Sequence, residues 1–138
     1  GYEKHIQKYQ HILIEGKDFL AKNAKRNEVI TTNSGLQYEI LKNGNGPTPT
    51  QNDIVEIHYY DTYIDGSVYY NSYEEGSTLA VPVNGAFPGW GEALSLMSVG
   101  SKWKLYIPYY LAFGEKGDGQ KIGPFSTIIS EIELINIK

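Results

Sequence analysis

The sequence lacks several residue patterns that define whole classes of protein. It contains no cysteine, which excludes a disulfide framework, a thiolate zinc site and a cysteine nucleophile. It has no run of about 18 apolar residues, so it predicts no membrane-spanning helix. The net charge of −4 argues against nucleic-acid binding, because phosphate recognition needs a basic surface.

The chain also lacks a basic-then-apolar leader, and it begins at Gly1 rather than at methionine. We expect such a start where a signal segment has been removed from an exported bacterial protein. The composition, with 41% hydrophobic and 20% charged residues, is typical of a globular domain and leaves a cytoplasmic location open.

Among the aromatic residues, phenylalanine is scarce (4 residues) whereas tyrosine is abundant (12 residues). Tyrosine combines a large apolar ring with a polar hydroxyl, so it suits sites that are half buried and half hydrated. Many of the tyrosines fall within one predicted hairpin, namely Tyr59, Tyr60, Tyr63, Tyr69, Tyr70 and Tyr73. We therefore expect a partly hydrated aromatic site at that hairpin.

Residues 1–34 are predicted to form an amphipathic helix followed by a polar turn. Positions on one face recur at steps of three and four residues: Ile6, Tyr9, Leu13, Gly16 and Leu20. Two interpretations stay open: the helix packs on its own domain, or it is the end of a longer helix that leads to a dimerisation segment. Gly16 is expected to weaken the helix by up to about 1 kcal/mol.

From residue 35 onward, most apolar residues alternate with polar ones, which is the pattern of β-strands. The predicted strands cover residues 36–41, 53–60, 67–70, 78–83, 101–107 and 127–137. Residues 88–97 instead have helical spacing, with Pro88 in the first turn. The sequence therefore predicts an α+β fold: a twisted antiparallel half-barrel of five to six strands wrapped on one short helix, preceded by the N-terminal linker helix.

This half-barrel domain is expected to cover residues 35–138. Within it, the glycine-rich segment of residues 109–125 connects the last two strands. Loops of this length inside a compact domain usually have a function, so we expect a flap over a binding site.

Short motifs occur in a definite order along the chain. They are Gly35-Leu36-Gln37-Tyr38, Ile57-His58-Tyr59, Asp65-Gly66, Pro88-Gly89-Trp90-Gly91-Glu92-Ala93-Leu94, Met97-Ser98-Val99-Gly100, Ile107-Pro108, Phe113-Gly114-Glu115 and Glu131-Ile132-Glu133-Leu134. In this order the set resembles the FKBP-type peptidyl-prolyl cis-trans isomerases over about residues 35–138. Residues 16–24 resemble the linker helix of an exported bacterial branch, the macrophage infectivity potentiator-like isomerases.

The resemblance implies an isomerase that acts on X-Pro bonds of unfolded or exported polypeptides. Such bonds isomerise over tens to hundreds of seconds, against a barrier of about 20 kcal/mol. An apolar pocket lowers this barrier because it favours the twisted amide, which is less polar than the planar one. This chemistry needs no metal and no cofactor.

The resemblance also assigns residues to a proline pocket. Trp90 would form its floor and Tyr59 a wall that carries a hydroxyl. Tyr69 stands where the family usually has phenylalanine. Phe87 occupies the position whose backbone N–H donates to a ligand carbonyl, a role that any side chain allows.

Three further positions of the pocket follow from the same resemblance. Phe113 stands where a flap tyrosine commonly donates its hydroxyl, so one hydrogen bond worth about 1 kcal/mol is lost. Ala86 is smaller than the usual valine, and Ile122 matches an apolar residue of the flap.

Three departures from the family pattern fall in this pocket. Tyr70 stands where the family almost always has an aspartate that partners the pocket tyrosine, and Leu79 and Ser130 each replace an aromatic wall. Ser130 also interrupts an apolar row on the last strand, where a buried hydroxyl needs a partner. We hypothesise that Tyr70 supplies bulk or a hydrogen bond there, and that the re-formed pocket is slower on short peptides.

Two alternatives to an ordinary isomerase remain open. One is a proline-peptide binding or chaperone module whose isomerase pocket has decayed, because of the changes at Tyr70, Leu79, Phe113 and Ser130. The other is a carbohydrate-binding module built on exposed tyrosines, which would present a flat aromatic platform instead of a concave pocket over Trp90.

The resemblance has further implications for partners and location. It implies binding of macrolides of the FK506 type and a homodimer of the full-length protein through residues upstream of Gly1. It also implies a periplasmic or outer-membrane-associated location in bacteria, with no nucleic-acid partner and no membrane span.

Overall fold

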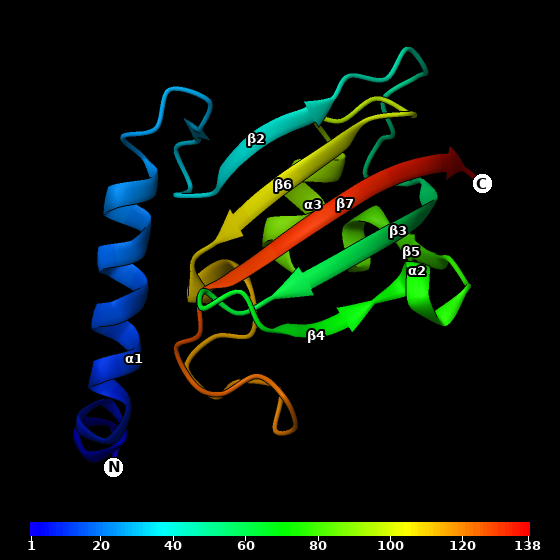
Figure 1. Cartoon of the computed structure of the whole chain (residues 1–138). Helices are drawn as coiled ribbons and strands as arrows, with labels where there is room; N and C mark the ends of the chain where they lie inside the picture. Colours follow the sequence, from blue (N-terminus) through cyan, green and yellow to red (C-terminus); the bar gives the residue numbers. More distant parts are fainter.

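The alternating residues build one antiparallel sheet that curves around a short helix (Figure 1). The computed structural model describes residues 1–138. The strands are β1 (Ile30–Thr31), β2 (Gln37–Lys42), β3 (Ile54–Thr62), β4 (Val68–Asn71), β5 (Leu79–Pro82), β6 (Lys102–Ile107) and β7 (Ile128–Ile137). Their order in the sheet is β1-β2-β6-β7-β3-β4, and β5 also pairs with β3.

The predicted fold class is confirmed. The count of seven strands exceeds the predicted five to six because β1 contains only two residues, too few for an alternating pattern to reveal. Strand β5 pairs only with β3 and ends at Pro82, as expected for an edge strand, because proline donates no hydrogen bond to a neighbour.

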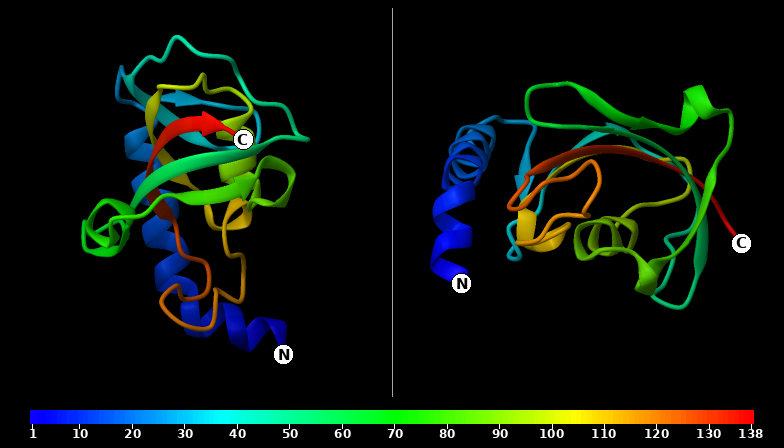
Figure 2. Two further views of the ribbon diagram at one scale, coloured as in Figure 1. Left: turned by 90° about the vertical axis from the view of Figure 1, so that its right-hand side faces the viewer. Right: turned by 90° about the horizontal axis from the view of Figure 1, so that it is seen from below.

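The hydrophobic core lies between the concave face of the sheet and α3 (Pro88–Leu94), which Figure 2 shows inside the curve. Val55 and Ile57 on β3 and Leu105 on β6 point into this core and are fully buried. Proline at the first turn of α3 suits the helix start, because its missing N–H would have no intrahelical acceptor there.

Helix α1 (Tyr2–Asn23) lies beside the sheet, at the end where β2 begins and β6 ends (Figure 1). Its predicted face turns toward the rest of the chain, with Gly16 and Asn23 buried. The structure therefore shows α1 packed against its own chain, and its continuation into a dimerisation segment stays a prediction. Gly16 permits this packing, because a Cβ atom at that position would collide with the Thr127 hydroxyl.

A polar cluster fastens the end of α1 to the sheet. We call its five residues, Asn23, Arg26, Gln37, Glu39 and Tyr106, the helix joint. The Asn23 amide donates to Gln37 Oε1 at 2.9 Å, and Arg26 donates to Asn23 Oδ1 at 2.9 Å and to the Tyr106 hydroxyl at 3.1 Å. Tyr106 in turn donates to Glu39. Asn23 and Gln37 are 6% and 4% exposed, and the Gln37 amide also donates to the Leu20 carbonyl at 2.9 Å, so both buried amides have hydrogen-bond partners.

The remaining elements are short: α2 (Ser72–Glu75), η1 (Val83–Gly85) and η2 (Tyr109–Leu111). The segment between β6 and β7 includes η2 and otherwise consists of turns and loops, in agreement with the predicted flap. None of the helices combines the length and the apolar character that a membrane crossing requires. The division of the chain at residues 34 and 35 stays a prediction.

Candidate functional site

A concave pocket of about 340 Å³ opens between the β3–β4 hairpin, α3 and the flap. Its lining is dominated by residues that the sequence placed in one site: Tyr59, Tyr69, Tyr70, Leu79, Phe87, Trp90 and Phe113. Residues 118, 120 and 121 of the flap and Asp61 of β3 complete it. The structure thus brings together side chains from residue 59 to residue 121 of the chain.

The aromatic rings of the pocket contact one another in a continuous series. Trp90 packs edge-on against Tyr59, with ring centroids 5.0 Å apart, and lies 4.8 Å from Phe87. Phe87 lies 5.3 Å from Phe113 of the flap, and Tyr70 stacks on Tyr59 at 4.6 Å. Such contacts are worth about 0.5–1.5 kcal/mol each beyond their buried area, so they hold the walls at a definite spacing.

Phe87 is the N-cap residue of α3, in an extended conformation just before Pro88. Residues before proline avoid the helical region, which explains why the helix begins only after it. The backbone N–H of Phe87 donates to no acceptor within the chain. A donor therefore stands free beside the Trp90 ring, which is the arrangement expected for holding a substrate carbonyl.

Four residues of the pocket were not predicted from the sequence: Asp118, Gln120 and Lys121 of the flap, and Asp61, the buried one. The Asp61 side chain is 4% exposed, and its two oxygens accept different hydroxyl groups. Ser130 donates to Asp61 Oδ1 at 2.5 Å, and Tyr69 donates to Oδ2 at 3.1 Å. Ser130 also accepts the indole N–H of Trp90 at 3.0 Å, so Asp61, Ser130 and Trp90 form one chain of hydrogen bonds.

The register of the sheet explains this cluster. Asp61 is directly opposite Ser130 on β7 and directly opposite Tyr70 on β4. Side chains at directly opposite positions point to the same face, so all three face α3. The register of β3 and β4 shifts after Asp61, and the resulting bulge allows the neighbouring Tyr69 to reach the same carboxylate.

Burial controls the protonation of the acidic groups in this pocket. Desolvation raises the pKa of Asp61 to about 7, although its hydrogen bonds with Ser130 and Tyr69 act in the opposite direction. Burial also raises the pKa values of Tyr69 and Tyr59 well above that of a free tyrosine. Both tyrosines therefore keep their protons at neutral pH and remain hydrogen-bond donors.

The hypothesis that Tyr70 serves the Ser130 hydroxyl is wrong. Ser130 is fully buried, and its partners are Asp61 and Trp90, whereas Tyr70 stacks on Tyr59. The alternation along β3 could have revealed Asp61, because it is the next inward-pointing position after Val55, Ile57 and Tyr59. The predicted strand ended at residue 60, so Asp61 was not assigned to either face of the sheet.

Three predicted site residues do not line the pocket. Ser130 lies beneath it, as described. Ala86 packs against the core and borders a neighbouring cavity beside α3. Ile122 is 3% exposed, with its backbone bonded to Asp118, so its side chain supports the flap from inside. Their assignment to substrate binding stays a prediction.

The flap is fastened to the hairpin on the outer side of the pocket. The Tyr63 hydroxyl donates to the carbonyl of Lys121 at 2.7 Å, and the Lys121 ammonium donates to the carbonyl of Tyr69 at 3.2 Å. The rings of Tyr63 and Tyr69 lie 5.0 Å apart. Tyrosines of the hairpin thus form both the pocket wall and its connection to the flap.

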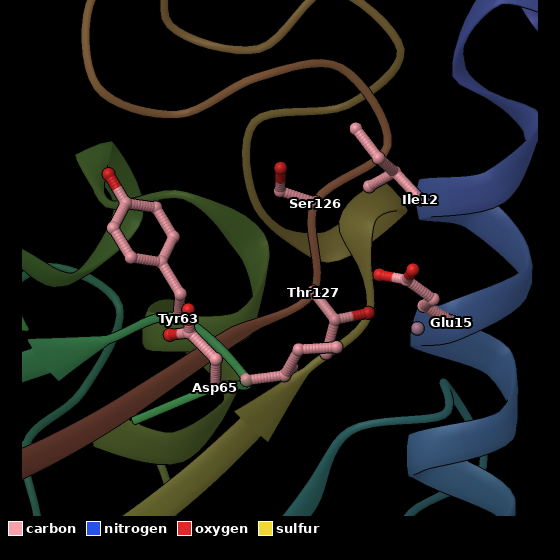
Figure 3. Close-up of a pocket in the computed structure, with 8 residues that line it drawn as sticks. Ile12, Glu15, Tyr63, Asp65, Ser126 and Thr127 are labelled. Carbon is pink, nitrogen blue, oxygen red and sulfur yellow. The ribbon is translucent and has the colours of Figure 1, made fainter. Parts of the chain in front are cut away.

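A second cavity, of about 210 Å³, lies outside this pocket, between α1 and the tip of the β3–β4 hairpin (Figure 3). Ile12 and Glu15 of α1 line one side, and Asp65 and Thr127 line the other. It has no series of aromatic rings and contains none of the predicted site residues. The aromatic pocket is therefore the candidate site.

Comparison with known proteins agrees with this geometry. The model of the family described as FKBP-type peptidyl-prolyl cis-trans isomerase matches residues 46–135, which include every residue of the pocket. The chain belongs to this family. A second family model, for the domain amino terminal to FKBP-type peptidyl-prolyl isomerase, matches residues 2–40 of the FKBP chain, which include α1 and most of β2.

Individual relatives extend over nearly the whole chain. The FKBP-type 22 kDa peptidyl-prolyl cis-trans isomerase of Escherichia coli strain K12 is 47% identical over 131 residues, which cover 95% of this chain and 64% of the relative. The outer membrane protein MIP of Legionella longbeachae is 39% identical over 124 residues, covering 90% of this chain and 54% of that protein. The chain therefore spans less than two thirds of the length of these relatives.

The fold comparison gives the same result. The crystal structure of FkpA from Escherichia coli superimposes with a TM-score of 0.92 at 36% sequence identity. The match covers 99% of this chain and 64% of that chain, so it includes α1 as well as the half-barrel. The position of α1 beside the sheet therefore corresponds to an arrangement seen in a solved FKBP-type relative.

Proposed function

We propose that the chain is a peptidyl-prolyl cis-trans isomerase that acts on X-Pro bonds of unfolded or exported polypeptides. The observation that carries this proposal is the aromatic pocket itself, closed by Trp90 and bordered by Tyr59, Phe87 and Phe113. A proline ring is apolar and compact, so a pocket of this size and lining suits it.

The proposed mechanism involves no covalent step. The proline ring rests on the Trp90 indole, and the free N–H of Phe87 holds the substrate chain through a carbonyl oxygen. Rotation about the prolyl bond removes amide resonance, and the twisted amide is less polar than the planar one. The apolar walls therefore favour the twisted state over the planar ground state and lower the barrier.

A decayed pocket is not the favoured interpretation. Its basis was the set of changes at Tyr70, Leu79, Phe113 and Ser130, of which the largest is Tyr70 in place of the family's aspartate. In this chain a carboxylate is nevertheless present, on the adjacent strand at Asp61, directly opposite Tyr70 in the register. Tyr70 instead adds a stacked ring to the Tyr59 wall. The pocket thus keeps a carboxylate and six aromatic residues in its lining, although Leu79 stands in place of one aromatic wall.

The decisive experiment measures the cis-to-trans rate of a prolyl tetrapeptide at increasing concentrations of the chain. We expect an observed rate that rises linearly with chain concentration, and competitive inhibition by a macrolide of the FK506 type. Refolding of a test protein limited by one X-Pro bond should accelerate in parallel. Saturable peptide binding without acceleration would instead identify a binding module.

Location and assembly belong to the same proposal. A bacterial envelope location, periplasmic or outer-membrane-associated, is supported by the relative from Legionella longbeachae, which is named an outer membrane protein. A homodimer would form through a segment of the full-length protein upstream of residue 1. Fractionation of cells that express the full-length protein tests the location, and sedimentation of that protein tests the dimer.

A further inference from the structure

The hydrogen bonds around Asp61 connect three surfaces of the pocket. The Asp61 carboxylate on β3 accepts the Ser130 hydroxyl of β7 at one oxygen and the Tyr69 hydroxyl of β4 at the other. Ser130 in turn accepts the indole N–H of Trp90 on α3. Each link joins a different element. A change at the carboxylate would therefore reach both the floor and a wall of the pocket.

We propose that Asp61 is a positioning residue whose ionised carboxylate orients Trp90 and Tyr69 for prolyl isomerisation. This inference rests on the proposed function. Asp61 acts through the two aromatic side chains and takes no part in bond making or breaking. The ionised form of the pocket is the active form, and protonation of Asp61 loosens it.

The donor and acceptor capacity of the groups explains why ionisation matters. An ionised carboxylate accepts from both Ser130 and Tyr69, and Ser130 then has a lone pair free for the Trp90 N–H. A proton on Oδ1 would turn that oxygen into a donor toward Ser130, whose own proton would have no acceptor, because the indole nitrogen only donates. A proton on Oδ2 would instead reverse the second hydrogen bond, so that Asp61 donates to the Tyr69 hydroxyl and the Tyr69 proton loses its acceptor.

The titration of Asp61 falls in a range where turnover can be measured. Burial raises the pKa of Asp61 to about 7. The other ionisable groups of the pocket are Tyr59 on β3, Tyr69 and Tyr70 on β4, and the flap residues at positions 118 and 121. The elements α3 and β7 contribute Trp90 and Ser130, which do not ionise. Asp61 is thus the buried carboxyl group among them.

The test compares pH profiles of kcat/KM for the parent chain and Asp61→Asn on a prolyl tetrapeptide between pH 5 and pH 9. We expect the parent to gain activity with a midpoint near pH 7. Asparagine has the shape of the protonated acid, so the variant should remain near the low-pH level of the parent, about tenfold below the parent at pH 8, without this transition.

A second measurement does not depend on turnover. The chain has only two tryptophans, so the indole N–H resonances of Trp90 and Trp103 are readily distinguished. We expect the Trp90 indole to shift with pH near 7 in the parent and to lose this shift in Asp61→Asn and in Ser130→Ala. The Trp103 indole, which has no hydrogen-bond partner, serves as the internal control.

The outcomes separate this inference from the proposed function. If the parent shows no turnover at any pH, the proposed function is wrong, and the role of Asp61 in turnover is wrong with it. If the parent is active but Asp61→Asn keeps the same rate and the same pH transition, the isomerase stands and the positioning role is overturned. An unchanged Trp90 titration in Ser130→Ala would also contradict the hydrogen-bonded chain.

Discussion

The aromatic pocket and the helix joint each contain buried polar side chains, Asp61 and Ser130 in one and Asn23 and Gln37 in the other, but these differ in chemistry. The helix joint is built on two neutral amides: Asn23 donates to Gln37, Gln37 donates to the Leu20 carbonyl, and Arg26 donates to Asn23 and pairs with Glu39. The pocket instead buries one carboxyl group without a basic partner, supported by the hydroxyls of Ser130 and Tyr69.

This difference indicates that the buried amides of the helix joint serve stability and that the buried carboxyl group of the pocket serves function. A satisfied pair of amides rigidifies a joint at little cost, whereas an unpaired buried carboxylate is costly because it has lost its hydration. We infer that the helix joint stabilises the position of α1, and that the pocket retains a destabilising group because turnover requires it.

The largest expected effect is the pH dependence of the pocket's contribution to stability. The pKa of Asp61 is raised to about 7 from 3.8, so the folded state binds this proton more tightly than the unfolded state does. The resulting stabilisation is complete below about pH 4 and is lost as the pH rises through about 7. Relative to Asp61→Asn, the parent should lose up to about 4 kcal/mol of unfolding free energy over that interval.

Urea unfolding of both proteins at pH 4, 5.5, 7 and 8 measures this difference. The variant is the proper reference, because every other carboxyl group titrates equally in the two chains. A parent-to-variant difference that stays constant with pH would show that Asp61 does not carry a buried, unpaired charge.

Next in size is the contrast between the two buried tryptophans. Trp90→Leu removes the pocket floor, and we expect kcat/KM to fall about 100-fold, equivalent to about 2.7 kcal/mol. Trp103 is buried to the same degree but stacks on Tyr38 in the core, so Trp103→Leu should lower the unfolding free energy while leaving kcat/KM of the folded protein intact. Equal losses of turnover in both variants would remove the distinction between floor and core.

A substitution in the helix joint should have the opposite signature. Asn23→Ala leaves the buried Gln37 amide without its donor, so we expect a loss of about 2 kcal/mol of unfolding free energy and an unchanged kcat/KM. Asn27→Ala, at an exposed position just after α1, is the matched control and should change stability by less than about 0.5 kcal/mol. Reduced turnover in Asn23→Ala would show that α1 also shapes the pocket.

The smallest effect concerns the stacked ring at position 70. Tyr70→Ala removes its contact with Tyr59, and the loss of about 1 kcal/mol corresponds to roughly a fivefold drop in kcat/KM. Tyr70→Phe keeps the ring and should stay within about twofold of the parent. If the two variants lose activity equally, the hydroxyl and not the stacking is what the pocket uses.

The sequence predicted most of the fold, because its signals are local. The alternation of Val55, Ile57 and Tyr59 and the helical spacing around Trp90 depend only on neighbouring residues. Both elements are present, although β3 continues to Thr62 and α3 ends at Leu94. The aromatic lining was also predicted, through the ordered motifs of the family. Both the elements and the aromatic lining can therefore be predicted without knowing which strands are neighbours in the sheet.

The polar part of the pocket could not be predicted in the same way. Asp61 and Ser130 are 69 residues apart, and only the register of β3 against β7 brings them opposite each other. Ser130 was recognised as a hydroxyl in an apolar row, but its partner depended on that register. The packing role of Gly16 could not be predicted either, because its close approach to Thr127 is a tertiary contact.

A ¹H–¹⁵N NMR titration of the folded chain with a prolyl tetrapeptide locates the peptide-binding site directly. We expect the largest chemical-shift changes at the Phe87 backbone N–H and the Trp90 indole N–H, while the resonances of the Trp103 indole and of the helix-joint amides stay unchanged. Shifts centred instead on the cavity between α1 and the hairpin tip, or no shifts at saturating peptide, would contradict a binding site at the aromatic pocket.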